Sequence, residues 1–200
     1  MGLFSLEKED EMPRTILFTI LLTVCFGVSP VYPDEARLAE SRQAVKEFAG
    51  DLKGELLAAL EEGGPVKAVT VCSRKAPAIA QRISGARGWD VGRTSLRVRN
   101  PGNAPDAWER RTLEAFEERR AKGEKPGGME HAEALNEGGK RVFRYMKAIP
   151  AGELCLTCHG KRIAPDLAAT LAELYPEDRA TGFSLGEIRG AFSITQPMTE

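Results

Sequence analysis

Two cysteines and a histidine stand close together in the stretch ELCLTCHGK: Cys155, Cys158 and His159. On a helical turn, thiols three residues apart point to the same side, so both can form thioethers with the two vinyl groups of one haem. The adjacent imidazole is then held beneath the iron as an axial ligand. The spacing therefore predicts one covalently attached haem c, with His159 on one side of the iron.

Three other chemistries use paired cysteines, and each explains less of the motif. A zinc site would need two more ligands, and only Cys72 and His131 offer them once the N-terminal leader is set aside. A thioredoxin-like dithiol usually opens a helix after a strand and has no histidine at this position. A disulfide within the motif leaves His159 without a role. Haem is therefore the favoured interpretation.

The other side of the iron has five candidate ligands: Cys72, His131, Met129, Met146 and Met198. Methionine is the usual sixth ligand of small electron-carrying cytochromes. Cys72 has the best argument from the residues, because it is unpaired and is followed by Arg74 and Lys75, whose charges would favour a thiolate. A buried structural thiol is nevertheless the commoner fate of a lone cysteine, so both interpretations of Cys72 stay open.

The stretch RTSLRVRN supplies three arginines, Arg93, Arg97 and Arg99. Arginine forms bidentate contacts with carboxylates, so this group can include a partner for a haem propionate. Arg93 and Arg99 are our candidates for that contact. Solvent-facing arginines of an alternating strand are an equal alternative.

Residues 1–33 have the features of an export signal. Arg14 precedes an apolar run from Ile16 to Val28, and such a helix is shorter than the roughly 20 residues that span a bilayer. The order of features predicts a signal peptide cleaved between Ser29 and Asp34. An uncleaved N-terminal anchor and a lipoprotein modified at Cys25 are the alternatives.

Export has consequences for location and for the cysteines. Translation can begin at Met1 or at Met12, because the acidic residues between them are unusual for a signal. In either case we expect residues 34–200 to form a single haem c-binding domain in the periplasm. Thioether bonds to haem are normally made outside the cytoplasm, and the three cysteines that remain include one unpaired thiol, Cys72.

The charge pattern excludes nucleic acid as a partner. The chain has 28 Lys and Arg against 29 Asp and Glu, for a net charge of −1. Charges of both signs interleave and no basic run is long, so no surface is predicted to follow a phosphate backbone.

The elements that must position the motif are helices and antiparallel strands. Apolar residues at three- and four-residue steps predict a long helix over 34–62, which Gly63 and Gly64 end. A second helix begins at Pro65, places Cys72 on its inward stripe and is expected to kink or split at Pro77. We further expect strands over 95–99 and 141–150, helices over 105–123 and 165–176, and a hairpin over 181–195. This mixture indicates an α+β fold in one domain.

Four separated blocks carry a family resemblance: AVTVCSRKAPAIA, GRTSLRVRNPGNAPDAWE, CLTCHGK and YPEDRATGFSLGEIRGAFSI. In this order they resemble a bacterial family of secreted c-type haem proteins with a PAS-like fold, long known only as a domain of unknown function. The similarity runs from about residue 36 to 197. It implies an antiparallel sheet with flanking helices, and iron held by His159 and, on the far side, by Cys72.

The resemblance implies a role in redox or small-ligand sensing. Some members carry the domain outside a membrane-bound signalling protein, and we expect no transmitter in this chain, so signalling would require a separate periplasmic or membrane partner. A diatomic gas is the expected small ligand. The alternative is a simple periplasmic electron carrier with fixed coordination. An enzyme such as a peroxidase is the third hypothesis, because the sequence has no candidate acid–base residues beside the motif.

Overall fold

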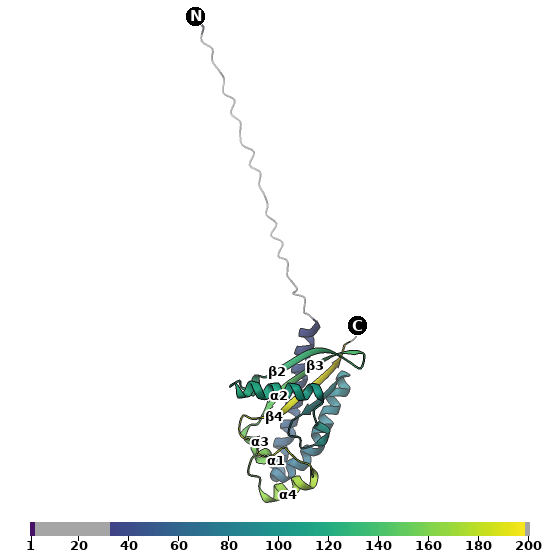
Figure 1. Cartoon of the computed structure of the whole chain (residues 1–200), viewed down its shortest axis with the longest axis vertical. Helices are drawn as coiled ribbons and strands as arrows, with labels where there is room; N and C mark the ends of the chain where they lie inside the picture. Colours follow the sequence, from purple (N-terminus) through teal and green to yellow (C-terminus); the bar gives the residue numbers. More distant parts are fainter. Residues whose placement is uncertain (3–32, 199–200) are drawn as a thin grey trace. The chain divides into compact units, whose positions relative to one another are not determined.

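A four-stranded antiparallel sheet forms the centre of the computed structural model, which describes residues 1–2 and 33–198. The strands are β1 (Asp90–Thr94), β2 (Glu130–Glu137), β3 (Lys140–Pro150) and β4 (Ile188–Pro197). Their order across the sheet is β1-β4-β3-β2, so the last strand of the chain lies between the first and the third (Figure 1). Of the residues predicted to form a signal peptide or anchor, residues 3–32 lie outside the described part of the chain.

A long helical hairpin, α1 (Pro33–Arg87), covers one face of the sheet. Gly63 and Gly64 have non-helical dihedral angles, and Gly64 has a φ of 68°, which favours glycine. The chain reverses there, because ion pairs join the two halves in antiparallel order: Lys75 to Glu55 and Arg82 to Glu47. The prediction of two helices separated by the two glycines is confirmed.

The expected kink at Pro77 is wrong. Within α1 only Gly63 and Gly64 leave the helical region, so the second half of the hairpin continues through the proline. A proline removes one backbone donor but does not force a break when both flanks of the helix are packed. Here Ala76 and Ile79, on either side of Pro77, are buried and anchor both flanks.

The sheet buries a different apolar core on each face. Towards α1, Phe143 and Tyr145 pack with Phe48 and other residues of the hairpin. Towards helix α2 (Ala107–Ala121), Met146 packs with Trp108 and Phe116. Alternate residues of β3 therefore face opposite layers, as the period of a strand requires.

The remaining elements are short and lie near the ends of the sheet. They are helix α3 (Glu153–His159), helix α4 (Pro165–Leu174) and two 3₁₀ turns, η1 (Pro101–Asn103) and η2 (Pro126–Gly128). Helix α4 packs Leu167 and Leu171 against Val69 of α1. Helix α2 begins with a capping box, in which Asp106 accepts a hydrogen bond from the Glu109 amide and Glu109 accepts one from the Asp106 amide.

Two strand predictions are wrong. The first strand covers Asp90–Thr94 rather than 95–99, because the Ser95 hydroxyl accepts a hydrogen bond from the Arg97 amide at 3.1 Å and turns the chain. The glycine-rich stretch 181–195 does not form a hairpin. Its second half is strand β4, which pairs with β1 and β3 instead of with its own beginning.

The fold class expected from the sequence is confirmed: α+β, with a PAS-like antiparallel sheet, flanking helices and a long N-terminal helix. Over residues 33–198, no helix combines the length and apolar character needed to cross a membrane.

Candidate cofactor site

One cavity of about 560 Å³ gathers most of the residues singled out in the sequence. It lies between the α1 hairpin, strands β1 and β4, and helix α3. Its walls include Cys72, Cys155, Cys158, His159, Arg93 and Arg99. The volume is within the usual range for small-molecule and cofactor sites. Apolar side chains such as Phe48, Leu52 and Phe192 form much of the remaining surface.

Helix α3 carries the two cysteines and the histidine and is fixed at its C-terminal end by the chain around Phe183. The Phe183 amide donates to the His159 carbonyl and the Gly182 amide to the Gly160 carbonyl, both at 2.9 Å. A Cβ atom at position 160 would lie 2.4 Å from the Leu156 carbonyl oxygen, so glycine is required directly after His159. Both thiols and the imidazole of the motif line the cavity.

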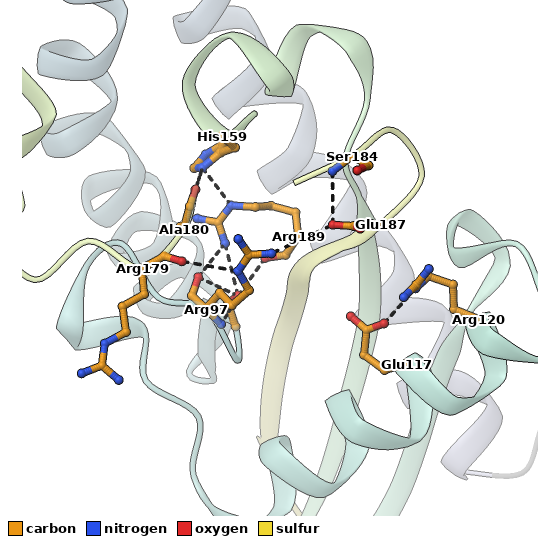
Figure 2. A network of polar contacts seen from close by, with 10 residues as sticks. Arg97, Glu117, Arg120, His159, Arg179, Ala180, Ser184, Glu187 and Arg189 are labelled. Carbon is orange, nitrogen blue, oxygen red and sulfur yellow. Dashed lines mark hydrogen bonds and ion pairs between the residues drawn. The ribbon is translucent and has the colours of Figure 1, made fainter. Parts of the chain in front are cut away.

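The imidazole of His159 has a defined tautomer. Its Nδ1 lies 2.7 Å from the Ala180 carbonyl oxygen, which can only accept, so Nδ1 carries the hydrogen (Figure 2). Burial, together with the positive charges of Arg189 and Arg99, lowers the pKa of His159 to about 2. The ring is therefore neutral and presents the lone pair of Nε2, which is the arrangement found in metal-ligating histidines.

A polar chain links this histidine to the arginines. Arg99 donates from Nε to Asp178 at 3.0 Å and from Nη2 to the Cys158 carbonyl at 2.6 Å. Asp178 in turn accepts from the Ala180 amide at 2.7 Å, and Ala180 holds His159. Arg99 thus supports helix α3 and the imidazole, with two of its nitrogens already engaged.

Cys72 lies on the inward side of α1 and faces the same cavity as the motif. Burial raises the pKa of the Cys72 thiol, while the positive charge of Arg93 opposes that rise. The expectation that Arg74 and Lys75 would favour the thiolate is wrong. The cationic neighbour is Arg93, which comes from the sheet, and Lys75 pairs with Glu55 on the outside of the hairpin.

Arg93 and Arg189 are guanidinium groups of the cavity wall without a carboxylate partner among the described residues. Burial lowers the pKa of Arg93, and it lowers that of Arg189 to about 10 with help from the charges of Arg99 and Arg93. Sequence reasoning identified Arg93 and Arg99 but missed Arg189. The only local signal for Arg189 was its place in a block that carries the family resemblance.

The other candidate iron ligands lie elsewhere. Met129 and Met146 are fully buried on the α2 side of the sheet, and Met198 packs at the edge of the core beside α1. His131 belongs to β2, where its ring stacks on Trp108 with centroids 5.7 Å apart. Across residues 33–198, no three His, Cys, Asp or Glu side chains converge as they would around a metal ion.

Comparison with known proteins agrees with this architecture. The model of the Tll0287-like family matches residues 28–197. Among solved structures, the crystal structure of the cyanobacterial heme-protein Tll0287 superimposes with a TM-score of 0.65 and 26% sequence identity. The similarity covers 85% of this chain and 99% of that one. No curated protein sequence matches the chain.

Proposed function

The chain belongs to the Tll0287-like family, and from this premise we propose that it is a c-type haem protein with the cofactor in the cavity beside α3. Cys155 and Cys158 would form the two thioethers, and His159 and Cys72 would be the axial ligands of the iron. The single observation that carries the proposal is that all four residues line one cavity, although Cys72 is far from the motif in sequence.

The donor set and the cavity fit a haem. A neutral imidazole with its Nδ1 hydrogen held by a backbone carbonyl suits an iron ligand, and a cysteine sulfur on the opposing helix suits a second one. The apolar walls suit the macrocycle. The cavity wall includes Lys53, Arg93, Arg99 and Arg189 and no Asp or Glu, so it suits a ligand with carboxylates.

We further propose that the protein is a redox or small-ligand sensor rather than an electron carrier or an enzyme. A haem held there would supply a one-electron couple. As an anion, the Cys72 sulfur would be held most tightly by the oxidised site, which has the higher positive charge. It would be held less tightly once a periplasmic or membrane redox partner had supplied one electron, and a diatomic gas could then compete for its place.

The position of Cys72 supports the sensing role, because it lies within a long helix rather than on a loop. A change in its bonding acts directly on α1, which packs over the whole face of the sheet. The helix would then be the two-state element that a separate signalling partner reads. Export to the periplasm remains part of the proposal, because haem c is normally assembled there.

Electron paramagnetic resonance of the ferric protein, purified from a host that matures haem c, tests the ligand set. We expect the low-spin signal with a narrow g-spread that thiolate coordination produces, and its loss in Cys72→Ala. Covalent haem should remain in that variant, because the thioethers come from Cys155 and Cys158. A wide bis-His or His–Met pattern, unchanged by Cys72→Ala, would remove Cys72 from the iron.

Carbon monoxide separates the sensor from the electron carrier. The ferrous sensor should bind the gas, because its Cys72 ligand is exchangeable, whereas a carrier with fixed coordination should resist it. The double variant Cys155→Ala/Cys158→Ala is the control for attachment and should lose covalent haem on a denaturing gel. A ferrous protein that excludes carbon monoxide and shows one reversible couple would favour the electron carrier.

A further inference from the structure

Arg189 is the charged group in closest contact with the imidazole of His159. Its Nε lies 3.2 Å from His159 Nδ1 (Figure 2). Because Nδ1 already donates its hydrogen to the Ala180 carbonyl, this nitrogen does not accept from Arg189 as well. The contact therefore places a positive charge against the ring without an additional hydrogen bond to it.

The guanidinium is held in this position by the turn that follows β1. Its Nη1 donates to the Ser95 hydroxyl at 3.2 Å and to the Arg97 carbonyl at 3.3 Å. Phe183 lies edge-on to the imidazole, with ring centroids 6.3 Å apart, and also contacts the Arg189 guanidinium. The ring and the charge beside it are thus fixed from several sides.

No described carboxylate cancels this charge. Asp178 forms its ion pair with Arg99 at 2.9 Å, and Arg189 has no ion pair among the described residues. An arginine guanidinium carries its positive charge at neutral pH. The partners of Arg189 are a hydroxyl and a carbonyl, which accept hydrogen bonds but carry no net charge.

We propose that Arg189 is a positioning residue for His159, and that its charge beside the imidazole, which forms no ion pair with a described carboxylate, raises the reduction potential of the site. The inference rests on the proposed function of His159 as an iron ligand. In many metal sites a carboxylate next to the ligating histidine increases the basicity of the ring. An arginine in that position does the opposite, and it favours the reduced form, which has one positive charge fewer.

The equilibrium concerned is a simple one. One electron passes from an external reductant such as dithionite to the ferric haem protein, and no bond to Arg189 is made or broken. Replacing Arg189 by glutamine removes the charge and keeps a polar side chain near Ser95. We expect the equilibrium constant for reduction to fall by at least about tenfold, which corresponds to about 59 mV in the midpoint potential of a one-electron couple.

Three matched measurements separate this role from a merely structural one. Arg189→Lys keeps the positive charge, so its midpoint potential should stay close to that of the wild type. Arg97→Gln removes a more exposed arginine that stacks on the same Phe183 ring and faces Glu187. This variant should change the equilibrium constant for reduction by less than about twofold. The electron paramagnetic resonance signal should be unchanged in Arg189→Gln, because both iron ligands remain.

The inference is overturned if Arg189→Gln leaves the potential unchanged, or if Arg189→Lys lowers it as much as Arg189→Gln does. If Arg189→Gln fails to fold or to attach haem, Ser95→Ala removes one of the two hydrogen bonds that hold the guanidinium. That variant should lower the potential in the same direction, and no change in it also overturns the inference. A wild-type chain without covalent haem would instead contradict the proposed function.

Discussion

Arg144 and Arg93 lie on opposite faces of one sheet, and their surroundings differ in kind. Arg144 of β3 points towards α2, is 5% exposed and lies over the Trp108 ring. Three carboxylates surround it: Asp106 at 2.6 Å, Glu137 at 3.0 Å and Glu109 at 3.5 Å. Arg93 of β1 points into the cavity, where the Phe48 ring is its aromatic neighbour at 5.5 Å.

The pKa values of the two arginines shift in opposite directions for this reason. Burial alone would lower the pKa of Arg144, but the hydrogen bonds that Arg144 donates to Asp106 and Glu137 outweigh burial and raise the pKa. Burial lowers the pKa of Arg93, and only weak attraction to Cys72 and Tyr175 opposes the shift.

The difference distinguishes a structural arginine from one that awaits a ligand. A buried charge with its partners present stabilises a particular packing, whereas a buried charge without partners costs several kcal/mol unless something else supplies the opposite charge. On the α2 face the buried guanidinium of Arg144 has its carboxylate partners, although its Nε has no hydrogen-bond partner. Arg93 on the cavity face has no carboxylate partner among the described residues, and a cofactor with carboxylates, or a thiolate at Cys72, would supply the opposite charge.

The same substitution at both arginines gives the largest expected effect. In the haem-free chain Cys155→Ala/Cys158→Ala, Arg144→Met should lower the free energy of unfolding by about 3 kcal/mol, because it removes one partner from a buried ionic cluster. Arg93→Met in the same chain should not lower the free energy of unfolding and should instead raise it, because it removes a buried charge that has no carboxylate partner. Urea unfolding followed by circular dichroism measures both.

The exposed Arg110 of α2 provides a third substitution as control, since Arg110→Met removes an arginine with no described ion pair. The free energy of unfolding of this variant should match that of the haem-free chain Cys155→Ala/Cys158→Ala. The contrast between the two arginines is contradicted if Arg93→Met lowers the free energy of unfolding as much as Arg144→Met does, because Arg93 would then have a structural role in the haem-free chain.

A pair of glycines tests whether the rim of the cavity is closely packed. Gly190 of β4 and Gly92 of β1 both line the cavity. A Cβ atom at 190 would lie 2.4 Å from the Thr94 carbonyl oxygen, whereas one at 92 meets nothing within 4 Å. Gly190→Ala should therefore destabilise the chain by about 2 kcal/mol, as overpacking does. Gly92→Ala is the matched control and should leave the urea midpoint near that of the parent chain. Equal effects of the two substitutions would show that the backbone at the edge of the cavity shifts to accommodate the added Cβ atom.

Sequence reasoning succeeded where the relevant pattern is local. The two halves of α1, strand β3 and helix α4 follow from periodicity, because each buries one stripe or one face. Cys72 was placed on an inward stripe, and the structure puts it on the same cavity as the motif. That these side chains bind iron stays a prediction.

The wrong or missing predictions have both local and long-range causes. Strand β2 was not predicted, because five of its eight residues are exposed and its charged side chains are typical of a loop. The first strand was misplaced because the Ser95 hydroxyl interrupts an apparently regular alternation. Arg189 meets His159 only because β4 and α3 are brought together by a sheet whose strand order does not follow the sequence.

The smallest expected effect concerns a partly exposed ion cluster on the α1 side of the sheet, at its β2 edge. Glu130 of β2 accepts hydrogen bonds from Arg42 of α1 at 3.1 Å and from Tyr145 of β3 at 2.8 Å. The Arg42 hydrogen bond, the largest cause, holds the pKa of Glu130 below its ordinary value, against burial and with help from the tyrosine hydroxyl. The carboxylate thus joins three elements while remaining accessible to solvent.

Glu130→Gln should lower the free energy of unfolding by about 1 kcal/mol at pH 7, after allowance for solvent screening. Because the pKa is lower in the folded than in the unfolded chain, this contribution is complete above the unfolded value near 4.5 and disappears as the pH falls through the folded value. Wild type and variant should therefore converge in acid, which urea unfolding between pH 7 and pH 3 measures. Glu124→Gln, at a fully solvated pair with Arg119, is the control and should show no measurable difference. A gap that persists in acid would mean that the Glu130 side chain acts by packing rather than through its charge.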